Sequence, residues 1–125
     1  MKVEHLAVWV SDLERMREFY QTYFGASAND KYINPKKGFS SYFLSFEESP
    51  RLEIMHKDGL VPDSGETFGL AHFAVALGSK QKVDQLTERF RLDGFEVVGN
   101  PRTTGDGYYE SVIKDPEGNL IELTV

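Results

Sequence analysis

Hydrophobic and polar residues alternate along the first ten positions of the chain. One face of this stretch carries Leu6, Val8 and Val10, and the other carries Val3, His5, Ala7 and Trp9. A period of two residues is typical of a β-strand, in which successive side chains point to opposite faces. Residues 2–10 are therefore predicted to form a strand.

The pattern then changes to the period of a helix. Ser11 is the expected N-cap, and Glu14, three residues later, completes a capping box. The predicted apolar stripe consists of Leu13, Met16, Tyr20, Tyr23 and Phe24. The helix is expected to end at Gly25, because glycine readily adopts the left-handed conformation that closes a helix.

The same order of elements recurs in the second half of the chain. A strand is predicted over residues 70–77, Ser79 is the expected cap of a second helix, and Gly94 follows that helix. The apolar face of this helix is formed by Val83, Leu86 and Phe90. Residues 3–8 read VEHLAV and residues 70–75 read LAHFAV, and equivalent positions lie 67 to 69 residues apart. This pattern indicates an internal duplication.

Three strand-like stretches follow each predicted helix, with turn residues between them. They are residues 28–33, 40–46 and 51–56 in the first half, and 96–102, 108–114 and 120–125 in the second. Each half therefore reads βαβββ. We predict an α+β fold in a single domain spanning residues 1–125, with module 1 over 1–59, a linker over 60–66 and module 2 over 67–125.

Four candidate metal ligands occupy equivalent positions in the two modules. His5 and His72 lie in the two first strands, and Glu53 and Glu122 lie in the two last strands. All four are on the face opposite the branched aliphatic residues that would pack beneath the helices. The other residues of the ligand face are mostly small or apolar: Val3, Ala7, Trp9, Met55, Ala74, Ala76 and Leu120. The ligand face therefore resembles the lining of a cup.

A polar side chain in such a lining needs a partner, because burying a bare carboxylate is costly. One divalent ion would satisfy all four side chains. Imidazole and carboxylate ligands suit Zn, Ni, Co, Mn or Fe, and four protein ligands in octahedral geometry leave two positions for water or substrate. His56 falls on the opposite face from Glu53 and near a loop, so it is interpreted as a surface residue.

Composition narrows the range of partners. The chain has no cysteine, which excludes disulfides, thiolate metal sites and a cysteine nucleophile. Its net charge is −6 and it has no basic stripe, which argues against nucleic acid and anionic membranes. No apolar run approaches the roughly 20 residues that span a bilayer, and no export signal is recognisable. A cytoplasmic location and a small-molecule substrate are expected.

The chain resembles the vicinal oxygen chelate superfamily, which includes glyoxalase I, fosfomycin-resistance proteins, methylmalonyl-CoA epimerase, extradiol dioxygenases and bleomycin-binding proteins. The motifs that carry the resemblance are residues 3–8 with Asp12, 18–25 (EFYQTYFG), 52–54 (LEI), 69–72 (GLAH) and 115–123 (DPEGNLIEL). The resemblance implies that the two modules pair into a barrel-like cup with the helices outside. It also implies a homodimer.

The ligand set resembles that of glyoxalase I-like lyases and epimerases. Dioxygenases and fosfomycin transferases use two His and one Glu, and have no carboxylate where Glu53 stands; bleomycin-binding proteins lack the ligands. The resemblance implies a metal-dependent lyase or isomerase acting on a small oxygenated substrate. In enzymes of this kind the metal would acidify a C–H bond of the substrate and stabilise the enediolate that forms, and the resemblance implies that Glu53 or Glu122 moves the proton.

Two positions depart from bacterial glyoxalase I. Trp9 stands in place of an Arg that grips glutathione, and Lys57 in place of an Asn. A lactoylglutathione lyase-like activity is therefore one candidate among several. Two alternatives remain open: a non-catalytic drug- or metabolite-binding resistance protein, and a thiol transferase or dioxygenase that uses three ligands.

Overall fold

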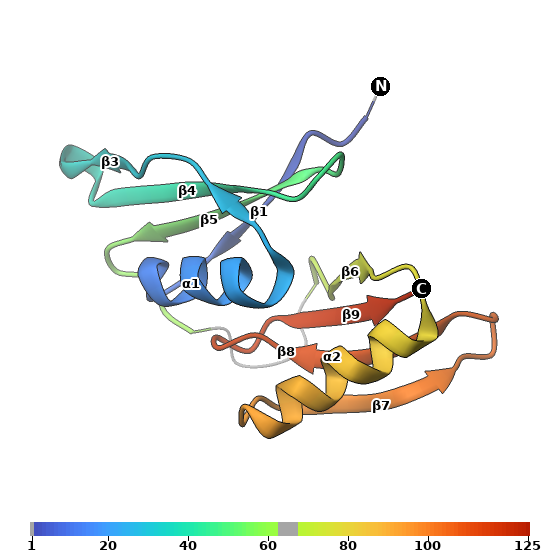
Figure 1. The fold of residues 1–125 in the computed structure, drawn as a ribbon. Helices are drawn as coiled ribbons and strands as arrows, with labels where there is room; N and C mark the ends of the chain where they lie inside the picture. The colour runs from blue at the N-terminus through green and yellow to red at the C-terminus, as the bar shows by residue number, and fades with distance from the viewer. Residues whose placement is uncertain (1, 63–67) are drawn as a thin grey trace. The chain divides into compact units, whose positions relative to one another are not determined.

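The computed structural model describes residues 2–62 and 68–125. The chain divides into two compact units, Met1–Ser64 and Gly65–Val125, which are described separately below (Figure 1). The predicted linker over residues 60–66 falls mostly on residues 63–67, which lie outside the described part of the chain. Within the described residues, no helix has the length and apolar character needed to cross a bilayer.

Unit 1 is a mixed sheet with one α-helix packed against it. Its elements are β1 (His5–Trp9), α1 (Leu13–Phe24), β2 (Ser27–Ala28), β3 (Tyr32–Asn34), η1 (Pro35–Lys37), β4 (Phe39–Ser45) and β5 (Arg51–Lys57). The strand order is β1-β5-β4-β2, with β3 also paired to β4. Strands β1 and β5, the first and last of the unit, pair in parallel. The core beneath α1 contains Met16, Tyr20, Leu44 and Ile54, all fully buried.

Unit 2 repeats this arrangement. Its elements are β6 (Phe73–Ala76), α2 (Lys80–Leu92), β7 (Val97–Thr103), β8 (Tyr109–Lys114) and β9 (Leu120–Thr124). The strand order is β6-β9-β8-β7, and the first and last strands again pair in parallel. The buried residues include Val83, Phe90, Ile113, Ile121 and Leu123. The predicted α+β class with two βαβββ modules is confirmed.

The predicted N-cap of the first helix is wrong by one residue. Asp12, not Ser11, caps α1, and its Oδ1 accepts a hydrogen bond from the backbone N of Arg15 at 3.0 Å. A carboxylate at this position also interacts favourably with the helix dipole. Glu14 does not complete a capping box, because its carboxylate accepts hydrogen bonds from Tyr42 Oη and Lys31 Nζ instead. The other caps, Ser79 and the left-handed Gly25, are confirmed.

The strand predicted over residues 28–33 is divided into β2 and β3. Asn29 lies between them, and its side-chain Oδ1 accepts a hydrogen bond at 2.7 Å from the backbone N of Phe43, while its own N donates to the Phe43 carbonyl. The Asn29 side chain therefore accepts a hydrogen bond from β4 that a backbone carbonyl would accept in a continuous strand. The first strands are also shorter than predicted, and His72 lies one residue before β6.

Candidate metal centre

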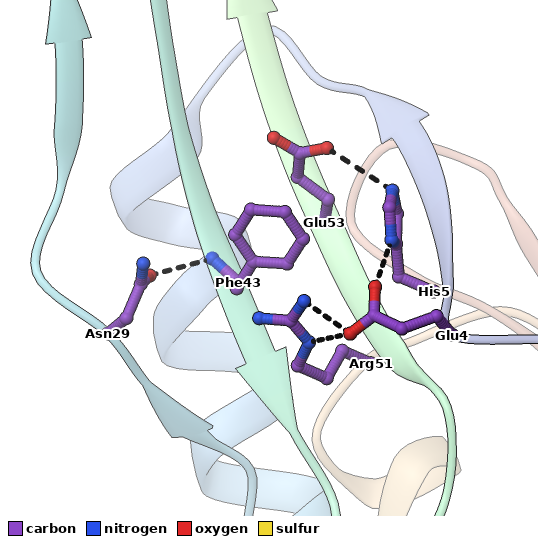
Figure 2. A network of polar contacts seen from close by, with 6 residues as sticks. All are labelled: Glu4, His5, Asn29, Phe43, Arg51 and Glu53. Carbon is purple, nitrogen blue, oxygen red and sulfur yellow. Dashed lines mark hydrogen bonds and ion pairs between the residues drawn. The ribbon is translucent and has the colours of Figure 1, made fainter.

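The parallel pairing of β1 and β5 brings His5 and Glu53 together in unit 1. Ala7 lies opposite Glu53 in this ladder, so His5, two residues earlier, is on the same face as Glu53. The distance from His5 Nε2 to Glu53 Oε2 is 3.9 Å (Figure 2). The Glu53 side chain is only 15% exposed, whereas that of His5 is 40% exposed. The Glu53 carboxylate therefore lies closer to the sheet, and the His5 imidazole lies nearer to solvent.

Unit 2 contains the same pair in the same register. Ala74 lies opposite Glu122 in the β6–β9 ladder, and His72 precedes Ala74 by two residues. The distance from His72 Nε2 to Glu122 Oε2 is 3.2 Å, and the side chains are 43% and 20% exposed. Each unit therefore presents one imidazole nitrogen and one carboxylate oxygen on the sheet face away from its helix.

The spacing within each pair can be compared with that needed around an ion. An ion about 2.1 Å from both atoms separates nitrogen and oxygen by about 3.0 Å at a right angle and about 3.4 Å at a tetrahedral angle. The 3.2 Å separation in unit 2 lies within this range. The 3.9 Å separation in unit 1 is wider than this range. The donor atoms of both pairs fit a divalent ion of the kind that imidazole and carboxylate bind.

A second carboxylate lies behind His5. Glu4 Oε2 is 2.5 Å from His5 Nδ1, and Glu4 Oε1 accepts a hydrogen bond from Arg51 Nε at 2.8 Å and another from Arg51 Nη2 (Figure 2). The hydrogen bond from His5, followed by those from Arg51, holds the pKa of the Glu4 carboxyl below its usual range. Sequence reasoning missed Glu4 and Arg51. Strand alternation points neighbouring side chains to opposite faces, but Glu4 precedes the first strand residue.

The face around the first pair is aromatic. Trp9 lies on the same face as His5, and its ring contacts Phe39 at 6.3 Å between centroids, while Tyr32 contacts Phe39 at 6.0 Å. Trp9 is 50% exposed and Tyr32 53% exposed. We call Trp9, Tyr32 and Phe39 the aromatic cluster. It gives this face of unit 1 an apolar surface.

The predicted four-ligand set is not tested by the geometry within either unit. Within residues 2–62 and 68–125, no three His, Asp or Glu side chains gather closely enough to hold a metal ion. Each unit supplies one His–Glu pair, and the joining of the two pairs at one ion stays a prediction. The His56 side chain is 34% exposed, and its Nδ1 donates to the Val10 carbonyl at 2.9 Å.

Comparison with known proteins finds a matching family model and related bacterial proteins. The family model of the Glyoxalase/Bleomycin resistance protein/Dioxygenase superfamily matches residues 2–123. The uncharacterized protein YqjT of Bacillus subtilis (strain 168) is 29% identical over 97% of this chain and 96% of its own length. The uncharacterized protein PA2024 of Pseudomonas aeruginosa is 30% identical over 96% of this chain and 85% of its own length.

Solved structures show the same architecture. Glyoxalase I from Zea mays superposes with a TM-score of 0.81 at 26% identity and covers 98% of this chain. The present chain spans 44% of the length of the maize chain. A glyoxylase/bleomycin resistance protein/dioxygenase domain from Frankia sp. EAN1pec superposes with a TM-score of 0.85 over the whole of this chain, and at 16% identity it shows the fold alone.

Proposed function

Because the chain belongs to the Glyoxalase/Bleomycin resistance protein/Dioxygenase superfamily, we propose that it is a metal-dependent lyase or isomerase in which His5, Glu53, His72 and Glu122 bind one divalent ion. The observation that carries this proposal is the repeated His–Glu pair. Both pairs have the same register across parallel strands, and both carboxylates are largely buried.

Zn, Ni, Co, Mn or Fe fits this donor set, and the bound ion would supply Lewis-acid stabilisation of negative charge on a substrate oxygen. The chain's own residues perform the proton transfer. Glu53 or Glu122 takes a proton from the carbon next to a substrate carbonyl and returns it to the neighbouring carbon. Both carboxylates lie in partly buried positions, with side chains 15% and 20% exposed.

The substrate that we propose is a small oxygenated molecule with an apolar substituent. The aromatic cluster lies on the same sheet face as His5 and Glu53 and supplies an apolar contact surface. Trp9 cannot form the ion pair that an Arg at this position would offer to glutathione. A glutathione adduct, the substrate of a lactoylglutathione lyase-like reaction, is therefore only one of the candidate substrates.

A non-catalytic binding protein is the second candidate function. The exposed Trp9 and Tyr32 favour it, because aromatic rings bind planar drug or metabolite groups without any chemistry. The two candidates differ in what Glu122→Gln does. In a lyase this change removes turnover, whereas in a binding protein it leaves affinity for the ligand unchanged.

The proposal is tested by turnover of the full chain loaded with Ni, Zn, Mn or Fe. The substrates are α-oxoaldehyde–thiol adducts with apolar and with charged thiols, together with acyl-CoA epimers. Of Glu53→Gln and Glu122→Gln, the one that removes the base is expected to lower kcat by about 100-fold or more, since general acid–base catalysis contributes 10²–10⁴-fold. The other is expected to weaken binding of the ion. Glu18→Gln, an exposed glutamate on α1, is the matched control. Turnover that survives both site substitutions would exclude the proposed chemistry.

A further inference from the structure

The imidazole of His5 is contacted on the side away from Glu53 by a carboxylate that has its own cationic partner. We propose that Glu4 and Arg51 act as a positioning pair that fixes the orientation and tautomer of His5, so that its Nε2 is available to the ion; this inference rests on the proposed function. At the positions equivalent to Glu4 and Arg51, the second module has Ala71 and Leu120, which cannot form such a pair. The duplicated histidines therefore have different roles in holding the metal.

The tautomer follows from the hydrogen-bonding capacity of the partner. An ionised carboxylate only accepts hydrogen bonds, so the 2.5 Å contact between Glu4 Oε2 and His5 Nδ1 requires the proton on Nδ1. The neutral ring then has its lone pair on Nε2, the atom that faces Glu53. Metal-bound histidines commonly donate their second N–H to a carboxylate in this way.

Arg51 holds the Glu4 carboxylate and also forms part of the surroundings of the ring. Its guanidinium donates two hydrogen bonds to Glu4 Oε1 and lies 4.2 Å from the centroid of the Phe43 ring. Phe43 in turn meets the His5 ring edge-on, at 5.3 Å and 85°. Its backbone N is fixed by Asn29, as Figure 2 shows. The contacts with Glu4 and Phe43 thus restrict rotation of the His5 imidazole ring.

The contrast with module 2 makes this arrangement specific to His5. The residue before His72 is Ala71, where module 1 has Glu4, and the residue two before Glu122 is Leu120, where module 1 has Arg51. Neither an alanine nor a leucine side chain can accept or donate a hydrogen bond. His72 therefore provides an internal comparison in the same protein.

The first experiment measures the tautomers of the metal-free protein by long-range ¹H–¹⁵N NMR correlation of the histidine rings. His5 is expected to carry its proton on Nδ1 in the wild type. Glu4→Ala is expected to change the tautomer ratio of His5 and leave that of His72 unchanged. Glu4→Gln has one oxygen, which faces Arg51 in the wild-type arrangement, so its NH2 group would meet Nδ1 and should shift the proton of His5 toward Nε2. An unchanged His5 signal in Glu4→Ala overturns the proposal.

The second experiment measures zinc affinity by competition with a chromophoric chelator. Glu4→Ala should weaken zinc binding about tenfold, since outer partners of a metal-bound histidine contribute 10–100-fold. Arg51→Ala should weaken it in the wild type but not in the Glu4→Ala background, because Arg51 acts through Glu4. Glu18→Ala on the exposed face of α1 is the matched control.

The two proposals fail differently. If the wild type binds no zinc, the proposed function fails. If the wild type binds zinc and Glu4→Ala, with a wild-type circular dichroism spectrum, binds it equally well, the positioning role alone is overturned.

Discussion

Removal of the Tyr42 hydroxyl should destabilise unit 1 only while Glu14 is ionised. Tyr42 is 9% exposed, and its hydroxyl donates a 2.9 Å hydrogen bond to Glu14 Oε1. A hydrogen bond to a charged group contributes about 1.5–3 kcal/mol. The Glu14 side chain is 48% exposed, so solvent screening reduces this to about 1 kcal/mol for Tyr42→Phe.

The pH dependence of this effect follows from the pKa shifts of both groups. The Tyr42 hydrogen bond, followed by that of Lys31, lowers the pKa of Glu14 in the folded state. A lowered carboxyl pKa gives stability that is present above the unfolded pKa and lost as the pH falls through the folded one. Burial, followed by the bond to Glu14, raises the pKa of Tyr42, so its stability is lost only in alkali. The loss of unfolding free energy in Tyr42→Phe should therefore be constant between about pH 5 and pH 9, and it should become smaller below about pH 4.

Urea denaturation followed by tryptophan fluorescence measures this effect, because Trp9 is the single tryptophan and lies in unit 1. Tyr42→Phe should lower the free energy of unfolding by about 1 kcal/mol at pH 7, and by clearly less at pH 3.5. Tyr108→Phe, at a position 58% exposed, is the matched control and should change nothing. An equal loss at both pH values, or none at pH 7, would refute the reasoning.

Three further predictions test the capping, hydrogen bonding and packing described above. Asp12→Ala should cost about 1 kcal/mol in thermal or urea unfolding, and more than Ser11→Ala, because Asp12 caps α1. The reverse order would restore Ser11 as the cap. Thr87→Val should cost about 1–3 kcal/mol, since it leaves the buried Ser111 hydroxyl without its 2.6 Å partner; combination with Ser111→Ala should recover part of that loss. Leu123→Ala, at a fully buried position, should cost about 2–5 kcal/mol in the same assay, and a loss below 1 kcal/mol would contradict the assigned core.

The sequence predicted the parts of the fold that depend on periodicity. A period of two residues places Ile54 and Leu123 under the helices and Glu53 and Glu122 on the opposite face, and the structure has them there. The equal spacing of His and Glu in the two halves predicted one site made by all four side chains, and their joining at one ion stays a prediction. The structure brings His and Glu together within each unit, at 3.9 Å in the first and 3.2 Å in the second.

Features that depend on individual side-chain hydrogen bonds were not predictable in this way. Ser11 and Asp12 are both good caps by residue type, and only the geometry of the chain entering α1 selects Asp12. Asn29 interrupts a strand-like stretch because its side chain bonds to the neighbouring strand. Glu4 turns toward His5 because it lies just outside β1, where strand alternation does not apply.

The central claim is that two His–Glu pairs from the two modules share one ion, and a zinc titration of the metal-free chain tests it most directly. We predict one zinc per chain. His5→Ala and His72→Ala should each weaken that single site by more than about 100-fold, because even outer partners of metal ligands contribute 10–100-fold. Two independent zinc ions per chain, one lost with each substitution, would contradict the claim, as would the absence of zinc binding.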